Sequence, residues 1–303
     1  MPRRLAVVGP TASGKSALAL EVARRRRPAE LLSMDAMAVY RGMDVGTASP
    51  SAAELAGLVC GGMDLVDPGE DFSVGAYQAA VRPLLADADR RGVAVVAVGG
   101  TGLYVRAVVD DLTIPGRFPD IRAALEAESD SAVLYDRLRE LDPVAAERTG
   151  PQNRRRIVRA LEVSLGSGRQ FSSYGPGLGS YGPSRFAQVG LHLPRPLLDA
   201  RIAARYRAQV EAGFLEEVRR LRDSAVPLSR TARHALGYRE LLAHLDGSCS
   251  LPEALAEAAR RTRRFARRQE RWFRRDPRIR WLDVREDPME VLPAVLETFD
   301  RCT

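Results

Sequence analysis

Residues 5–16 read Leu5-Ala6-Val7-Val8-Gly9-Pro10-Thr11-Ala12-Ser13-Gly14-Lys15-Ser16, and this stretch decides the fold. The apolar run Leu5–Val8 stops at a glycine, as a buried parallel strand does. Residues 9–16 fit the pattern G-x-x-x-x-G-K-[ST], and a helix is expected from Gly14 onward. A chance match in a glycine-containing turn is the alternative. The order of strand, loop and helix favours a phosphate-binding loop of the P-loop type.

The chemistry of such a loop predicts a phosphate-binding site. Its backbone amides form a cradle for phosphate oxygens, and the helix N-terminus adds its dipole. Lys15 is the only lysine of the chain, whereas the other 45 basic side chains are arginines, so this position is predicted to need an ammonium. We expect the Ser16 hydroxyl to bind Mg²⁺. All members of the loop are candidates for binding phosphate groups, such as those of a diphosphate: Gly9, Pro10, Thr11, Ala12, Ser13, Gly14, Lys15 and Ser16.

Apolar and helical patterns along the chain predict an α/β protein, a P-loop NTPase-like parallel sheet core with an all-helical insertion. Strands are expected at Glu30–Ser33, Val93–Val98, Phe186–Leu193 with alternating burial, and Ile279–Leu282. A long loop is expected from Met34 to Pro68, and a Gly/Ser/Pro/Tyr linker from Gly166 to Ser184. Outside the insertion, helices are expected at Val74–Arg90, Pro252–Arg275 and Asp287–Phe299. The predicted catalytic core comprises residues 1–112 and 185–303, and the predicted insertion comprises residues 113–184.

Composition narrows the class of protein. The chain has 303 residues, 45% of them hydrophobic, and a formal net charge of +7, which fits either an anionic partner or a solvated basic surface. No apolar run reaches the roughly 18 residues that a membrane span requires. Its three cysteines, Cys60, Cys249 and Cys302, match no zinc spacing or disulfide framework. A cytoplasmic protein is therefore expected.

Several segments together resemble the bacterial tRNA dimethylallyltransferases, also called isopentenyltransferases. They run in family order over almost the whole chain, and the set is far more specific than any one member. They are Gly9–Ser16, Ser33–Met37 with Val39–Ala48, Val98–Tyr104, Asp142-Pro143, Arg154–Val163, Arg201-Ile202 with Arg205, Gly213-Phe214, Glu217-Val218, Leu236–Glu240, Arg268-Gln269 and Trp272–Arg274.

The resemblance implies transfer of the dimethylallyl group from dimethylallyl diphosphate to N6 of adenine at tRNA position 37. It implies that Asp35 accepts the proton of the adenine amine, that Thr101 bonds a diphosphate or bridging oxygen, and that Arg205 holds the diphosphate beside Lys15. Each role has a plainer alternative: a Mg²⁺-organising aspartate for Asp35, a helix N-cap for Thr101 and a solvated surface arginine for Arg205.

The resemblance also implies contacts with the tRNA anticodon stem-loop. Basic side chains would hold the backbone while the target base leaves its stack. Arg155, Arg156 and Arg159 share one helical face, whereas Phe265, Trp272 and Phe273 are expected in the core. The candidate tRNA-binding residues are Asp35, Ala36, Met37, Ala38, Thr101, Arg122, Arg155, Arg156, Ile157, Val158, Arg159, His234, Ala235, Leu236, Gly237, Tyr238 and Arg239. A monomer is expected, because one chain carries both substrate sites.

Two other functions remain open from the residues alone. A P-loop taken by itself most often belongs to an ATP- or GTP-hydrolysing enzyme or to a small kinase. A small-molecule kinase would bind ATP and transfer phosphate to a hydroxyl. A basic RNA-binding module without catalysis is disfavoured by the intact phosphate loop.

Overall fold

A computed structural model describes residues 2–302, and the chain divides into two compact units. The first unit runs up to Asp110 and resumes at Pro183, and the second comprises Asp111–Gly182. Both boundaries lie two residues before those predicted. No helix within residues 2–302 is both long and apolar enough to cross a membrane.

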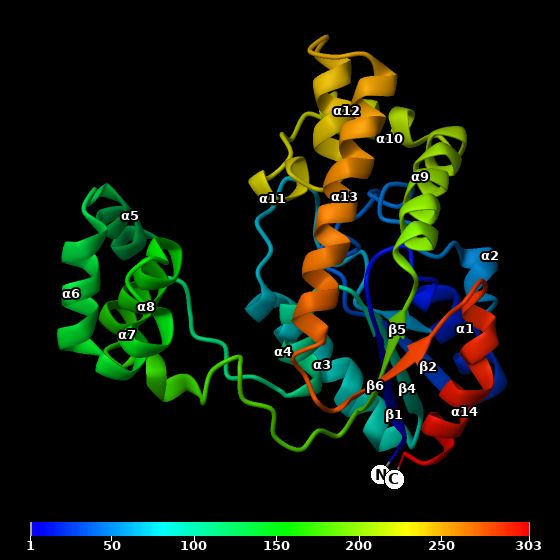
Figure 1. Ribbon diagram of the computed structural model, residues 1–303, viewed down its shortest axis with the longest axis horizontal. Helices are drawn as coiled ribbons and strands as arrows, with labels where there is room; N and C mark the ends of the chain where they lie inside the picture. Colours follow the sequence, from blue (N-terminus) through cyan, green and yellow to red (C-terminus); the bar gives the residue numbers. More distant parts are fainter. Residues whose placement is uncertain (1, 303) are drawn as a thin grey trace. The chain divides into compact units, whose positions relative to one another are not determined.

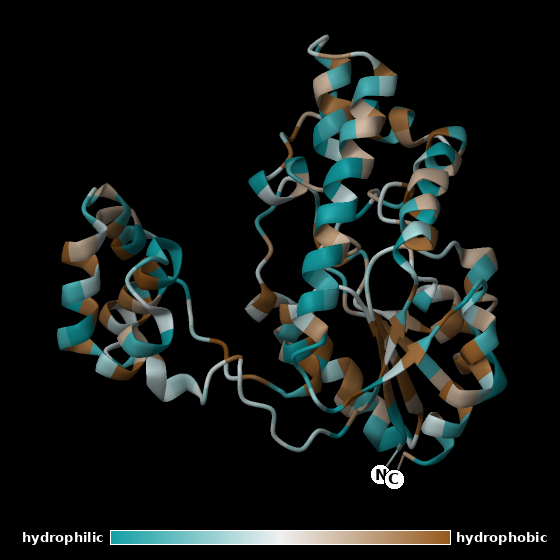
Figure 2. Cartoon of the chain, in the orientation of Figure 1, coloured by the Kyte–Doolittle hydropathy of each residue, from teal (hydrophilic) through white to brown (hydrophobic). Residues whose placement is uncertain are grey.

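A six-stranded sheet forms the centre of the first unit, with strand order β3-β2-β4-β1-β5-β6 and every pairing parallel (Figure 1). The predicted α/β class is confirmed. Figure 2 shows hydrophobic residues concentrated on these strands. The strands are β1 (Arg4–Val8), β2 (Ala29–Ser33), β3 (Cys60–Gly61), β4 (Ala94–Gly99), β5 (Ala187–His192) and β6 (Ile279–Asp283).

Parallel register brings the carboxyl ends of the central strands to one edge of the sheet. Val8 pairs with Gly99 of β4 and with Gly190 of β5, and Ser33 of β2 pairs with Val98. The turns that follow β1, β2 and β4 therefore begin side by side, at the edge where open α/β sheets bind their ligands.

Helices cover both faces of the sheet. In Figure 1, α1 (Lys15–Arg25) and α14 (Leu292–Asp300) lie on one side, and α3 (Val74–Arg91) and α4 (Gly102–Val109) lie on the other. Two faces covered by helices explain why β1 is buried along its whole length. The last predicted helix is interrupted, because residues Pro288–Val291 form the short 3₁₀ helix η2 before α14 begins.

A second group of helices in this unit packs around α13 (Leu251–Phe273), which contacts α9 (Arg195–Glu211) and α12 (Tyr238–Leu245). Alanines such as Ala254, Ala258 and Ala266 form much of its buried face, and from Arg260 onward its exposed residues are arginines. Figure 2 shows hydrophilic residues along this helix. Small buried side chains allow neighbouring helices to approach closely. The group is completed by α10 (Phe214–Arg222) and α11 (Arg230–Arg233).

Two predictions about strands and loops were wrong in detail. The expected loop from Met34 to Pro68 contains α2 (Ala52–Leu55) and β3, which are too short to produce a visible periodicity. The expected alternation in β5 is absent, because its four central residues are all buried. A strand that lies between two parallel neighbours and is covered on both faces has no solvent side.

The second unit is a small all-helical bundle with its own core. Its elements are α5 (Pro119–Ala127), α6 (Ser131–Leu141), α7 (Pro143–Thr149), α8 (Arg154–Ser167) and the 3₁₀ helix η1 (Phe171–Tyr174). Side chains cap three of the helices: Asp130, Asp142 and Asn153 accept hydrogen bonds from the first turns of α6, α7 and α8. Phe171 packs on the core of this unit, so part of the predicted linker is folded.

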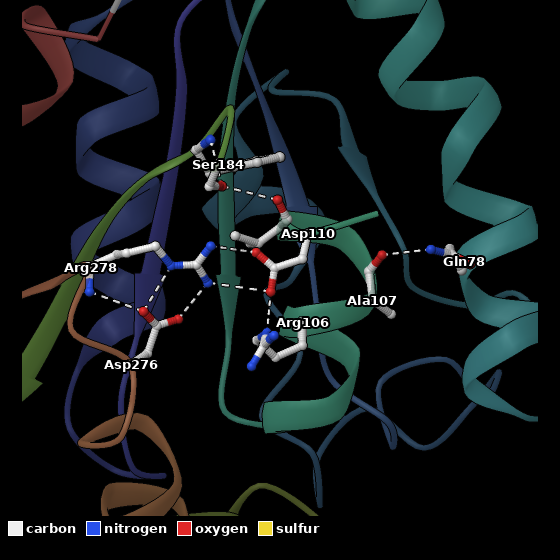
Figure 3. Close-up of polar contacts among 9 residues, drawn as sticks. Gln78, Arg106, Ala107, Asp110, Ser184, Asp276 and Arg278 are labelled. Atoms are coloured by element: carbon white, nitrogen blue, oxygen red, sulfur yellow. Dashed lines mark hydrogen bonds and ion pairs between the residues drawn. The ribbon is translucent and has the colours of Figure 1, made fainter. Parts of the chain in front are cut away.

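Polar contacts tie together the chain ends at which the first unit is interrupted (Figure 3). The Asp110 carboxylate accepts hydrogen bonds from Arg278 at 2.6 and 3.3 Å and from Arg106. The Ser184 hydroxyl donates to the Val109 carbonyl at 3.0 Å. The first unit therefore holds the departing and the returning chain next to each other.

Candidate functional site

The loop between β1 and α1 has the backbone geometry of an anion cradle. Gly14 has a φ of 86° and Ala12 a φ of 62°, whereas Gly9 has a φ of 148°. Left-handed residues interspersed in a short loop can turn its amide groups toward an anion, which is how phosphate loops bind. A side chain at Gly14 would also collide with η2, since an added Cβ would lie 2.1 Å from Pro288 Cγ. Glycine is required here on both counts.

Two side chains of the loop are arranged as a phosphate ligand would need. The Lys15 ammonium donates to the Pro10 carbonyl at 3.1 Å. The pKa of Lys15 is lowered to about 8, chiefly by desolvation; the charge of Asp35 opposes this shift, and the nearby Arg205 contributes to it. The Ser13 hydroxyl is fully buried, and no residue within 2–302 forms a hydrogen bond with its oxygen. A buried hydroxyl without a hydrogen-bond partner is uncommon in folded proteins.

Arg205 reaches the loop from α9 and is not a solvated surface arginine. Its Nη1 donates to Thr11 Oγ1 at 2.8 Å, and its Nη2 donates to the carbonyls of Gly46 and Thr47 at 3.4 and 3.1 Å. Desolvation lowers the pKa of Arg205, and the nearby Tyr206 hydroxyl and Asp35 carboxylate raise it again. The guanidinium stays charged and lies beside the phosphate loop.

The turns after β2 and β4 meet through Asp35 and Thr101. Asp35 lies two residues beyond the end of β2, and its Oδ1 accepts from the Met37 amide at 2.8 Å. Thr101 Oγ1 accepts from the Ala36 amide at 3.3 Å. Thr101 occupies the N-cap position of α4, but its hydroxyl makes no capping bond. Oγ1 is the acceptor in its contact with Ala36, and no residue within 2–302 accepts a bond from this hydroxyl, so its proton remains available to a ligand.

Gln269 on α13 connects the phosphate loop to the turn that follows β4. The sequence did not predict this role. Its Oε1 accepts from the Thr11 amide at 2.9 Å, and its Nε2 donates to the Gly100 carbonyl at 2.8 Å. The side chain is 5% exposed. Gly100 leaves no room beside this amide, since an added Cβ would lie 2.4 Å from Nε2. Nothing in the local sequence around Gln269 could have identified partners so far away in the chain.

The predicted tRNA-binding residues of the first unit divide by exposure. His234 and Arg239 are exposed, whereas Leu236 is half-buried. Ala235 and Tyr238 are 5% and 1% exposed, and Tyr238 donates to Glu217 Oε1 at 2.6 Å. The side chains of Ala38 and Ala235 and the ring of Tyr238 form part of the protein interior, and Gly237 is also buried. RNA contact at these positions stays a prediction, and it would need backbone atoms or a rearrangement of these buried side chains.

The predicted tRNA-binding residues of the second unit also differ in their exposure to solvent. Arg155 and Arg156 are exposed on α8. Ile157 and Val158 are 0% and 2% exposed because helical periodicity turns them into the core of the bundle. RNA contact at these two positions stays a prediction.

Two further arginines of this unit are engaged with a buried carboxylate. Glu162 is 1% exposed and accepts from Arg159 at 2.8 Å and from the Phe118 amide at 2.9 Å. Arg122 pairs with the same carboxylate at 3.4 Å and with Glu126 at 2.8 Å. These two arginines therefore stabilise the bundle itself.

Magnesium binding can be judged from the donors that are present. Among residues 2–302, no three His, Cys, Asp or Glu side chains gather into a metal site. Mg²⁺ that is bound through substrate phosphates needs only one or two protein oxygens. The exposed Ser16 hydroxyl, in the first turn of α1, provides such an oxygen.

Comparisons with known proteins identify a family and several relatives. The family model described as IPP transferase matches residues 38–276. A tRNA dimethylallyltransferase from Kineococcus radiotolerans is 46% identical over 303 residues, which cover 97% of this chain and 95% of that protein. The corresponding protein from Bifidobacterium longum is 44% identical over 289 residues, which cover 93% of this chain and 87% of that protein.

A solved structure is also similar over the full length of the chain. The full-length tRNA isopentenylpyrophosphate transferase from Bacillus halodurans is 34% identical with a TM-score of 0.71, covering 100% of this chain and 98% of that one. The family match begins after the phosphate loop and Asp35, so the roles of these residues depend on the geometry described above. The chain belongs to the IPP transferase family.

Proposed function

We propose that this protein transfers the dimethylallyl group of dimethylallyl diphosphate to N6 of adenosine 37 in tRNA, releasing diphosphate. The observation that carries the proposal is the meeting of an anion cradle, two cations and a carboxylate at one edge of the sheet. Lys15 and Arg205 both experience the charge of Asp35, and Thr101 lies in the turn beside it. An allylic diphosphate and an amine need this combination.

Departure of the diphosphate is the step that the cations serve. The bond between the allylic carbon and the bridging oxygen breaks, and negative charge grows on the leaving group. Preorganised donors at the site of developing charge are usually the largest catalytic contribution, and the loss of one such donor costs about 10²–10³ in rate. We assign this role to the loop amides, to Lys15 and to Arg205, with the Thr101 hydroxyl donating to a diphosphate oxygen.

Attack by the adenine amine requires a proton acceptor. N6 loses a proton as its bond to the allylic carbon forms, and the Asp35 carboxylate takes that proton up. Asp35 is held in place by the Met37 amide, which leaves the other carboxylate oxygen to face the substrate amine. The alternative role of organising Mg²⁺ would leave the amine without a base in this part of the site.

Magnesium and tRNA complete the proposal. Mg²⁺, held by Ser16 and by substrate oxygens, would neutralise charge on the diphosphate. Exposed arginines such as Arg155, Arg156 and Arg239 are proposed to bind tRNA phosphates. We propose that the reaction takes place in the cytoplasm, where tRNA is found. We also propose a monomer, because one chain provides both the diphosphate-binding and the tRNA-binding side chains.

One experiment separates this function from its alternatives. The protein is incubated with dimethylallyl diphosphate labelled in the allylic group and with unmodified tRNA, in the presence and absence of ATP. We expect label in tRNA at position 37, little inhibition by ATP and no ATP consumption. Consumption of ATP coupled to turnover would support a small-molecule kinase. RNA binding without transfer of label would support a non-catalytic RNA-binding protein.

A further inference from the structure

A buried carboxylate outside the catalytic loops controls a neighbouring segment of backbone. Glu217 on α10 is 4% exposed. Its Oε2 accepts from the amides of Asp44 and Val45 at 2.9 and 2.8 Å, and its Oε1 accepts from the Gly46 amide at 3.1 Å. The Tyr238 hydroxyl donates to Oε1 at 2.6 Å. Three successive amides of one loop therefore converge on a single internal anion.

The opposite side of this loop is held by donors from α9. Gln209 Nε2 donates to the carbonyls of Val45 and Gly46 at 2.7 and 3.0 Å. Arg205 Nη2 donates to the carbonyls of Gly46 and Thr47 at 3.4 and 3.1 Å. The amides of the loop thus point to Glu217, and its carbonyls point to the helix that carries the diphosphate-binding arginine.

The loop of residues 44–47 is tightly packed, so it has little freedom to move if the Glu217 carboxylate is lost. Gly46 lies against two aromatic rings, and an added Cβ would stand 2.3 Å from Phe214 and 2.5 Å from Tyr238. The two rings meet edge to face with centroids 4.9 Å apart. Burial, and next the Glu217 carboxylate, raise the pKa of Tyr238, which keeps the phenol protonated as a donor. The Glu217 carboxylate is a buried charge whose two oxygens both accept hydrogen bonds. Its removal would leave the amides of residues 44–46 without an acceptor.

The geometry points to Glu217 as a positioning residue for Arg205. The carboxylate fixes residues 44–46, the carbonyls of Gly46 and Thr47 orient the Arg205 guanidinium, and the guanidinium is thereby aimed at Thr11 of the phosphate loop. Glu217 itself touches no substrate in this scheme. The inference rests on the proposed function, because it assigns Arg205 to the diphosphate.

A double-mutant cycle tests this chain of contacts directly. Glu217→Gln keeps the shape of the side chain but replaces one acceptor oxygen by an amide that faces backbone N–H groups. We expect about a tenfold loss of affinity for inorganic diphosphate, within the range of coupling energies between residues that share partners. In the Arg205→Ala background the same substitution should have almost no further effect, because the group that it positions is gone.

Two controls distinguish positioning from general stability. Glu216→Gln removes an exposed carboxylate from the adjacent position of α10 and should leave diphosphate affinity unchanged. Affinity for tRNA should remain within about twofold in Glu217→Gln, as the substitution acts on the diphosphate side. Should Glu217→Gln fail to fold, Gln209→Leu releases the same loop from its other side and should show the same dependence on Arg205.

The inference is overturned if the two substitutions act additively on diphosphate affinity, or if Glu217→Gln lowers only the melting temperature. Calorimetric titration with inorganic diphosphate provides the affinities without any need for prenyl transfer. A parent protein that binds diphosphate but transfers no prenyl group would contradict the proposed function, and the cycle would still decide the role of Glu217.

Discussion

The pH dependence of diphosphate use is the sharpest test of the lysine in the phosphate loop. In the proposed mechanism Lys15 binds the diphosphate as an ammonium, and its pKa is lowered to about 8, chiefly by desolvation. The binding form is therefore lost as the pH rises through about 8. Between pH 7 and pH 9 the charged fraction falls from about 90% to about 10%, so kcat/KM for dimethylallyl diphosphate should fall about tenfold.

The assay is prenylation of tRNA at saturating tRNA, with dimethylallyl diphosphate varied at each pH. The last phosphate ionisation of such substrates lies near 6, below this window, so the substrate itself stays fully charged. The profile of kcat should shift to higher pH than that of kcat/KM, because bound diphosphate stabilises the ammonium and raises the pKa of Lys15.

Lys15→Arg provides the matched comparison. A guanidinium stays charged throughout this pH range, so the variant should lack the fall between pH 7 and pH 9. Its activity should nevertheless be low with tRNA affinity intact, since the forked group is wider than an ammonium. The Lys15 ammonium lies against Gly100, where an added Cβ would be 3.4 Å from Nζ. A flat profile in the parent, or full activity in Lys15→Arg, would refute the reasoning.

Three further substitutions address other parts of the site. Asp35→Asn should preserve diphosphate and tRNA binding and lower the single-turnover rate by about 10²–10⁴, the usual range for a general base; a rate close to that of the parent would remove Asp35 from this role. Arg156→Ala should weaken tRNA binding and reduce the salt slope by about 0.7, as measured by binding titrations at several salt concentrations. An unchanged slope would make Arg156 a solvated side chain. Gln269→Leu leaves two buried backbone groups without partners, so urea denaturation should show a loss of about 1–3 kcal/mol or more. A loss under about 0.5 kcal/mol would mean that water or another group satisfies them.

Local patterns were sufficient wherever one short stretch carried its own signal. Val93–Val98 is apolar, β-branched and followed by two glycines, and it forms the central strand β4 almost as predicted. The strand, loop and helix around Lys15 likewise follow from spacing that requires no distant partner. β3 escaped prediction because two residues cannot show a period, and its pairing with β2 exists only in the folded sheet.

A motif predicts a tRNA-binding side chain only where that side chain is also exposed. Arg155 and Arg156 are exposed as their proposed role requires, whereas Ile157 and Val158 lie in the same segment but face the core. Helical periodicity held the signal that separates the two pairs, since residues adjacent in sequence project in different directions. Arg159 differs for another reason, because Glu162 binds it from one turn further along α8.

The sequence by itself determined that a phosphate loop follows the first strand of an α/β protein, since the residues that form it are contiguous. The tertiary structure alone decided which distant groups complete the site. Gln269 reaches Thr11 across 258 positions of the chain, and Glu217 holds backbone amides more than 170 positions away. Both act through backbone atoms, which every residue possesses, so no pattern of side chains could reveal these contacts. They exist because parallel strands bring their carboxyl ends together and the helices that cover them deliver the remaining donors and acceptors.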